Sequence, residues 1–91
     1  MESVSSFSPH GEGTSYALYE AYINGEWRAI IRYDTAHGFP HKDIIHPNGT
    51  VTKETFPGFS KAEVLTLGQK DIRRNWKRYR RNYEREMAEE S

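Results

Sequence analysis

Two Asn-Gly pairs, Asn24-Gly25 and Asn48-Gly49, constrain the fold of this chain more than any other feature of the sequence. Each pair stands between two runs that are rich in β-branched and aromatic residues, and both central residues of a tight hairpin turn must tolerate a positive φ. The flanking runs are 16–22 and 26–34 for the first pair, and 42–46 and 50–56 for the second. The sequence therefore predicts two successive β-hairpins, made of four antiparallel strands.

A long C-terminal helix is predicted to begin at Ser60. Ser60 and Glu63 have the spacing of a capping box, in which each side chain accepts a hydrogen bond from the backbone N–H of the other residue. Small and apolar residues then recur at spacings of three and four, which places them on one stripe of a helix. The stripe consists of Leu65, Gly68, Ile72, Trp76, Tyr79, Tyr83 and Met87. A break near residues 66–68 is an alternative, because glycine costs about 1 kcal/mol in a helix interior.

These elements predict an α+β fold: a four-stranded antiparallel meander in the order ββββα, with one long C-terminal helix packed on one face. Residues 1–14 are rich in serine and glycine and are expected to form a flexible N-terminal tail, which leaves 15–91 as a single α+β domain. Aromatic residues make up 13% of the chain. Large rings such as Trp27 and Trp76 are therefore expected to supply much of the buried area.

The composition excludes several kinds of chemistry. The 91 residues include no cysteine, which rules out disulfides, thiolate metal ligands and thiol nucleophiles. No apolar run approaches the ~20 residues of a membrane span, and no signal-peptide pattern opens the chain. We therefore expect a soluble, cytoplasmic protein with no membrane partner.

The formal net charge is zero, but its distribution is uneven, because eight Lys/Arg and only five Asp/Glu lie from Lys70 onward. At about 100° per residue, these eight cations fall within one arc of the predicted helix, whereas Asp71 and Asn75 fall outside it. The arc is either a solvated helix face or an anion-binding ridge for RNA or for an acidic protein. The candidate nucleic-acid-binding residues are Lys70, Arg73, Arg74, Lys77, Arg78, Arg80, Arg81 and Arg85.

The loop "RYDTAHGFPHKD", from Arg32 to Asp43, brings cations, acids and two histidines into one short connection. His37 and His41 could share the duties of general base and general acid near neutral pH. Arg32 or Lys42 could stabilise a pentacovalent phosphate, and an RNA substrate supplies its own 2′-hydroxyl nucleophile. The loop therefore suits metal-independent RNA cleavage.

Two other interpretations of the loop stay open. In the structural one, the histidines fix the loop by hydrogen bonds to backbone carbonyls, and Asp34 caps the turn. In the other, a metal is bound by His37, His41 and His46 together with an aspartate, although their spacing resembles no tight zinc signature.

The segments "IIRYDTAHGFPHKDIIHPNGT" and "NWKRYRRNY" resemble small prokaryotic and archaeal proteins of the TumE toxin-like group, with a likeness that covers roughly 27–83. The resemblance implies the toxin half of a two-gene toxin–antitoxin module that acts on RNA, with an antitoxin protein as partner. It would place Arg32, Asp34, His37 and His41 at the active centre.

The leading hypothesis is therefore a metal-independent ribonuclease without a cofactor. The alternative is a non-enzymatic nucleic-acid-binding or protein-interaction module that uses the basic helix. RNA is the expected partner in the first case, and a homodimer is left open in both.

Overall fold

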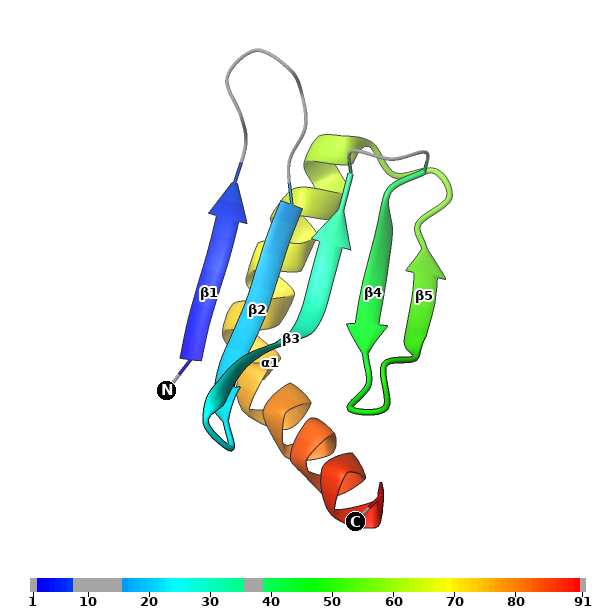
Figure 1. The fold of residues 1–91 in the computed structure, drawn as a ribbon. Coiled ribbons are helices and arrows are strands. Elements are labelled where there is room, and N and C mark those ends of the chain that lie inside the picture. Colours follow the sequence, from blue (N-terminus) through cyan, green and yellow to red (C-terminus); the bar gives the residue numbers. More distant parts are fainter. Residues whose placement is uncertain (1, 8–15, 36–38, 91) are drawn as a thin grey trace.

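The chain forms a five-stranded antiparallel sheet with one long helix on one face (Figure 1). A computed structural model describes residues 2–7, 16–35 and 39–90. Neighbouring strands in the sheet are also neighbours in the sequence. The strands are β1 (Glu2–Phe7), β2 (Tyr16–Ile23), β3 (Glu26–Asp34), β4 (His41–Ile45) and β5 (Val51–Thr55), and the helix is α1 (Lys61–Glu90). The predicted α+β class, the antiparallel meander and the long C-terminal helix are confirmed.

The two predicted hairpins are also confirmed. Asn24 and Gly25 have positive φ angles of 51° and 84°, as a tight turn between β2 and β3 requires. In the turn between β4 and β5, Gly49 has a φ of 91°. There the Oδ1 atom of Asn48 accepts hydrogen bonds from the backbone N of Thr50 at 3.0 Å and from its hydroxyl at 2.7 Å.

A fifth strand corrects the expectation of a four-stranded sheet. β1 lies within the stretch 1–14 that the sequence predicts to be a flexible tail, and it pairs with β2 from Glu2↔Ala21 to Phe7↔Tyr16. An edge strand is held by backbone hydrogen bonds to its neighbour, so a serine-rich segment can form one without an apolar run. Residue 1 and residues 8–14 of that stretch lie outside the described residues.

The core lies between α1 and the sheet. The predicted stripe is confirmed, since its members are buried or half-buried against the strands, and Val64 joins them as a fully buried residue. The alternative of a break near 66–68 does not occur, because α1 is continuous there. Gly68 instead allows a close approach to the sheet: a Cβ atom at this position would lie 2.5 Å from Cγ of Tyr33.

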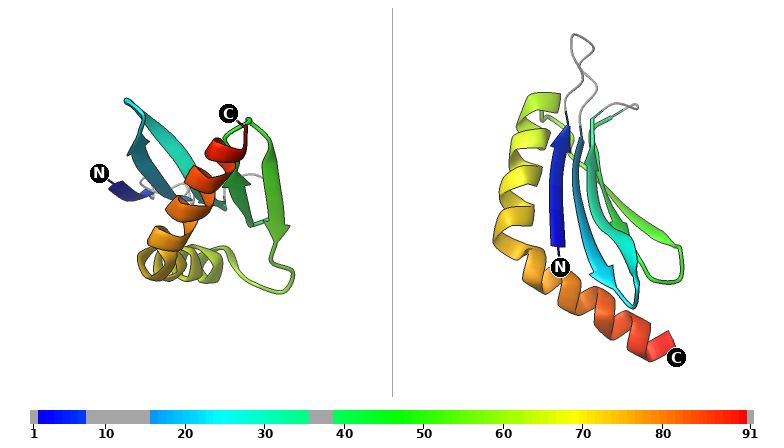
Figure 2. Two further views of the ribbon diagram at one scale, coloured as in Figure 1. Left: turned by 90° about the horizontal axis from the view of Figure 1, so that it is seen from below. Right: turned by 60° about the vertical axis from the view of Figure 1, so that its left-hand side comes forward.

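The predicted capping box begins the helix. The backbone N of Ser60 donates to Oε1 of Glu63 at 2.9 Å, and the backbone N of Glu63 donates to Oγ of Ser60 at 3.1 Å. Figure 2 shows that α1 then bends along its length, so that its C-terminal half turns beneath the sheet. This half reaches the β4–β5 turn, where Glu86 contacts His46 at 2.8 Å.

A β-bulge in β3 changes which residues face the core. The register between β2 and β3 shifts directly after Tyr19, and Ile30 is skipped in the pairing. As a result Ile30 and Ile31 are both buried, whereas Trp27 is 46% exposed. The expectation that Trp27 supplies buried area is therefore wrong, and the fully buried rings belong to Tyr19 and Tyr33.

The helix does not cover the whole face of the sheet. α1 lies mainly against β1, β2 and β3, and β4 and β5 extend beyond it. Space therefore remains between the helix and the last two strands. In the part of the chain that the structure describes, no helix is long and apolar enough to cross a membrane.

Candidate functional site

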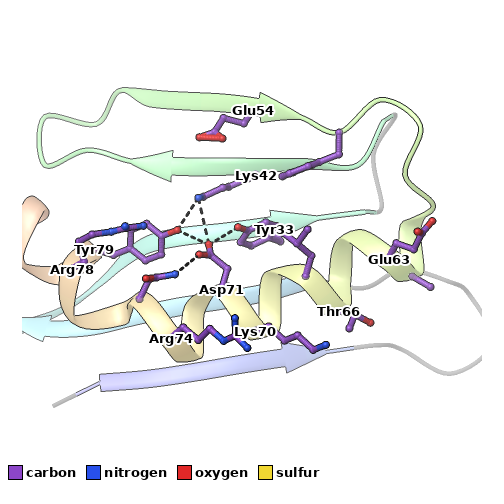
Figure 3. A pocket seen from close by; sticks show the side chains of 14 residues that line it. Tyr33, Lys42, Glu54, Glu63, Thr66, Lys70, Asp71, Arg74, Arg78 and Tyr79 are labelled. Atoms are coloured by element: carbon purple, nitrogen blue, oxygen red, sulfur yellow. Dashed lines mark hydrogen bonds and ion pairs between the residues drawn. The ribbon is translucent and has the colours of Figure 1, made fainter.

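An open groove lies between α1 and the helix-facing side of β3, β4 and β5 (Figure 3). Its volume is about 830 Å³, within the range of roughly 300–1,000 Å³ that is typical of ligand pockets. We call the five polar residues at its base the floor network. They are Tyr33 from β3, Lys42 from β4, and Asp71, Asn75 and Tyr79 from α1.

Asp71 connects the floor network. Its Oδ2 atom accepts hydrogen bonds from the hydroxyls of Tyr33 and Tyr79, both at 2.5 Å, and lies 3.4 Å from Nζ of Lys42. Its Oδ1 atom accepts a hydrogen bond from Nδ2 of Asn75 at 2.8 Å. Lys42 in turn donates to the hydroxyl of Tyr79 at 2.8 Å. Both carboxylate oxygens and the ammonium group are therefore satisfied by neighbouring side chains.

Strand register and helical spacing bring these residues together. Tyr33 and Lys42 are partners across β3 and β4, and the side chains of such partners lie on the same face of a sheet. Asp71, Asn75 and Tyr79 follow one another at intervals of four residues, so they share one side of α1. The network thus forms only when the helix docks on the sheet.

The surroundings of the floor network fix its charges. Burial alone would raise the pKa of Asp71, but the hydrogen bonds from Tyr33, Tyr79 and Asn75 outweigh it and hold that pKa below the ordinary value. Burial opposes the charge of Lys42, yet its hydrogen bond to Tyr79 and the nearby Asp71 carboxylate raise its pKa overall. Burial and the bonds to Asp71 raise the pKa of both tyrosines.

At neutral pH the floor network therefore contains one carboxylate, one ammonium and two neutral phenols. None of these groups is close to exchanging a proton, because their pKa values are shifted away from neutrality. General acid–base catalysis works best with groups that titrate near the operating pH. The floor network is therefore suited to forming a rigid base of the groove rather than to moving protons.

Three of the eight predicted nucleic-acid-binding residues border the groove, and we call them the groove cations. They are Lys70, Arg74 and Arg78. All three are exposed, and no acidic side chain pairs with them among the described residues. The guanidinium of Arg78 lies over the ring of Tyr79, 5.4 Å from its centroid, which positions it at the edge of the floor.

The other five cations do not line the groove. Arg80 pairs with Glu84 at 3.4 Å, and Arg85 pairs with Glu89 at 3.8 Å. The remaining three are exposed on α1 outside the groove, and we call them the outer cations: Arg73, Lys77 and Arg81. The predicted basic face is thus divided into positions with different surroundings.

The predicted catalytic residues that the structure describes lie on the opposite face of the sheet. Side chains alternate along β4, and Lys42 points towards α1, so His41 and Asp43 point away from it. In the register of β3 and β4, Asp34 is opposite His41 and Arg32 is opposite Asp43. Arg32, Asp34 and His41 are therefore brought together, but not with the groove.

His41 makes the contact that the structural interpretation of the loop predicts. Its Nδ1 atom lies 3.0 Å from the carbonyl oxygen of Phe39, which only accepts, so this nitrogen carries the hydrogen. Its Nε2 atom lies 3.5 Å from Oδ2 of Asp43, and the same oxygen is 3.2 Å from Nη2 of Arg32. His41 is buried, and its predicted catalytic partner His37 lies outside the described residues.

His41 and His46, the two histidines of the metal interpretation that the structure describes, are separated by the sheet. His46 points to the helix side, where its Nδ1 atom contacts Glu86 at 2.8 Å and its Nε2 atom contacts the hydroxyl of Thr52 at 2.7 Å. His41 points to the other side. Across residues 2–7, 16–35 and 39–90, no group of three or more His, Asp or Glu side chains could hold a metal ion.

The floor network is absent from the predictions made from the sequence. There Lys42 is expected only as a phosphate ligand in the loop, and Asp71 and Asn75 lie outside the cationic arc without a function. The sequence does contain a signal: Asp71 and Asn75 lie beside the apolar stripe and lead, at intervals of four residues, to Tyr79 within it. Polar residues at that spacing can form one connected row on a helix.

Comparison with known proteins adds one finding. Residues 7–89 match the model of a protein family that is described as a domain of unknown function. No curated protein and no solved structure matches the chain. A function must therefore be inferred from the geometry of the chain itself.

Proposed function

Because the chain belongs to the DUF7718 family of domains of unknown function, we propose its function from the groove alone: the protein binds RNA there without cleaving it. The groove cations on α1 hold phosphates of the RNA. The floor network supplies a rigid base, and it takes no part in chemistry.

The observation that carries this proposal is a row of three cations along one wall of a preformed groove, none of them paired with an acidic side chain that the structure describes. A phosphate can approach Lys70, Arg74 and Arg78 without displacing an acidic partner that the described residues supply. Guanidinium groups bind phosphate oxygens in a bidentate way. Low-dielectric walls around a cleft also strengthen the field of the charges that line it.

The floor network supports binding in a second way. Lys42 and Asp71 are largely buried and neutralise each other, and four hydrogen bonds or ion pairs converge on Asp71. The groove therefore has a defined shape before a ligand arrives. Binding to a preorganised site avoids much of the entropy cost of ordering side chains.

Aromatic rings beside the cations favour RNA over an acidic protein. Phe56 lines the groove and stacks on Tyr33, with ring centroids 6.0 Å apart. Unpaired bases stack on such rings, whereas the carboxylates of an acidic peptide do not. A protein partner remains an outcome of the test below.

The test compares two triple variants of the same helix. Lys70→Gln, Arg74→Gln and Arg78→Gln together should weaken binding of a labelled single-stranded RNA. They should also reduce the slope of log affinity against log salt concentration by about 2, because each phosphate contact contributes about 0.7 to that slope. Affinity is measured by fluorescence anisotropy over a series of salt concentrations.

The matched control replaces the outer cations, with Arg73→Gln, Lys77→Gln and Arg81→Gln. It removes the same charge from the same helix, and we expect it to keep most of the affinity and of the salt slope. An equal loss of affinity in both variants would mean that the whole basic face of α1 binds RNA, rather than the groove. A parent protein that binds no RNA at low salt would refute the proposal and leave an acidic protein as the partner to seek.

RNA cleavage on the face of the sheet that points away from α1, which we call the outer face, is a second candidate function. The observation in its favour is the register of β3 and β4, which places Asp34 opposite His41 and Arg32 opposite Asp43. These include three of the four residues that the likeness to TumE toxins implies. This candidate requires the purified protein to cleave RNA in the presence of chelator. A role as the toxin of a toxin–antitoxin module is what the likeness to TumE toxins adds to it.

A further inference from the structure

The two walls of the groove differ in charge, although Glu63 at the first turn of α1, whose carboxylate takes part in the capping box, also lines the groove. The groove cations lie on α1, and Glu54 lies on β5 across from them (Figure 3). Glu54 is the register partner of Lys42, so its side chain is on the helix-facing side of the sheet. It is exposed, and its carboxylate accepts no hydrogen bond from any residue that the structure describes.

A carboxylate reduces the affinity of a groove that binds phosphate alone, because like charges repel. Its presence is explained if the ligand also offers hydrogen-bond donors, since an ionised carboxylate only accepts. In RNA these donors are the amino and ring N–H groups of the bases. Guanine presents two adjacent donors, N1–H and N2–H, that match the two oxygens of one carboxylate. Uracil presents one donor between two carbonyl acceptors.

Apolar surface lies beside this carboxylate. Phe56 follows Glu54 by two residues and lines the groove, where it stacks on Tyr33. Phe59 makes an edge contact with Phe56, with centroids 6.1 Å apart, and is 46% exposed. A base that is bound at its Watson–Crick edge also needs a surface against its face, and aromatic side chains supply it in proteins that bind unpaired RNA.

We propose that Glu54 selects guanine in this groove. Its carboxylate accepts hydrogen bonds from N1–H and N2–H of an unpaired guanine that packs beside Phe56, while the groove cations hold phosphates of the same strand. The strand is unpaired, because a base pair would occupy the edge that Glu54 binds. This inference rests on the proposed RNA binding and adds the strand state and the base.

The experiment uses three short RNA oligonucleotides. The first contains only uridine, the second has one central guanosine, and the third has inosine in place of that guanosine and so lacks the N2 amino group. The parent protein should bind the guanosine oligonucleotide about tenfold more tightly than the uridine one, because a bidentate base contact typically discriminates by this order. The inosine oligonucleotide should bind with little of the added affinity that guanosine provides.

Glu54→Gln should remove the preference for guanosine and leave the affinity for oligouridine equal or higher. Glu90→Gln is the matched control, since it removes the charge of an exposed carboxylate outside the groove and should keep the preference. If the parent shows no preference for guanosine, or if the preference survives in Glu54→Gln, this inference is overturned. RNA binding in the groove would still be supported in that case by the loss of affinity in the variant without the groove cations. Failure of the parent to bind any of the three oligonucleotides would overturn both.

Discussion

Asp71 is the residue on which the groove depends most. Two phenols, an amide and an ammonium group all point to its carboxylate, and its side chain is 18% exposed. Without this charge Lys42 would keep a largely buried ammonium group that has lost its ion-pair partner. Removing one member of a buried ion pair typically costs about 3–5 kcal/mol, because the other charge remains out of water.

Asp71→Asn should therefore lower the free energy of unfolding by about 3 kcal/mol at neutral pH. The pKa of Asp71 in the folded protein is held below its ordinary value, which is about 3.9. The ionised carboxylate thus stabilises the fold above that value, and the stabilisation is lost as the pH falls through the folded pKa. Urea titrations should show the gap between parent and variant narrowing below about pH 4.

Glu90→Gln serves as the control for this measurement, since it changes an exposed carboxylate at the end of α1. It should be close to the parent at every pH. A gap between parent and Asp71→Asn that stays constant down to the lowest pH would mean that the Asp71 charge does not stabilise the fold.

At the scale of the elements, the docking of α1 on β3 depends on the lack of a side chain at Gly68. Gly68 lies against the ring of Tyr33, which is fully buried, so neither the backbone of the helix nor the ring has room to move. The same ring donates its hydroxyl to Asp71. The distance between helix and strand therefore also sets the geometry of the groove floor.

Gly68→Ala tests this close contact. On helix propensity alone, the change should stabilise α1 by about 1 kcal/mol. The new Cβ atom would lie 2.5 Å from Cγ of Tyr33, and overpacking of this kind typically costs about 1–3 kcal/mol. We therefore expect a net loss of stability in thermal and urea unfolding. Arg81→Ala, at an exposed position of the same helix, should change stability by less than about 0.5 kcal/mol. A stabilised Gly68→Ala protein would contradict the close packing.

The sequence predicts those elements that are specified locally. The Asn-Gly turns and the Ser60–Glu63 capping box each lie within a few residues, and both appear in the structure as expected. β1 was missed because its pairing with β2 depends on a partner strand rather than on its own composition. The bulge at Ile30, which exposes Trp27, likewise arises between two strands.

The candidate site could be predicted only in part for the same reason. The cations of α1 were found because charge and helical angle are visible in the sequence. Their division into groove cations and outer cations depends on where β4 and β5 pass the helix. The floor network joins residues almost forty positions apart, from Tyr33 to Asp71, so that no local pattern contains it.

At the scale of the whole molecule, the sheet separates two polar sites. The groove lies on the helix side, and Arg32, His41 and Asp43 lie on the other side. His41→Ala should lower the melting temperature, because it removes a partly buried hydrogen bond to the carbonyl of Phe39 and leaves that acceptor without its partner. The affinity of the groove for RNA should stay within about twofold of the parent, since a change on the far face leaves the phosphate contacts intact.

The same variant separates the two candidate functions when RNA cleavage is measured in parallel. Loss of a chelator-resistant cleavage activity in His41→Ala, with the fold retained, would favour the outer face as an active site. If the affinity of His41→Ala for RNA instead fell to that of the variant without the groove cations, the two faces would be coupled through the sheet.

The floor network has a consequence for the heat of binding. Its carboxylate, ammonium and phenol groups hold their protonation states across the neutral range, because each pKa is displaced away from neutrality. A phosphate that arrives at the groove therefore neither releases a proton from the floor nor draws one from the solvent. The floor network would then add no heat of proton transfer to the enthalpy of association in buffers that differ in their own heat of ionisation, and the phosphate contacts of the groove cations would make the amount of bound ligand depend on salt.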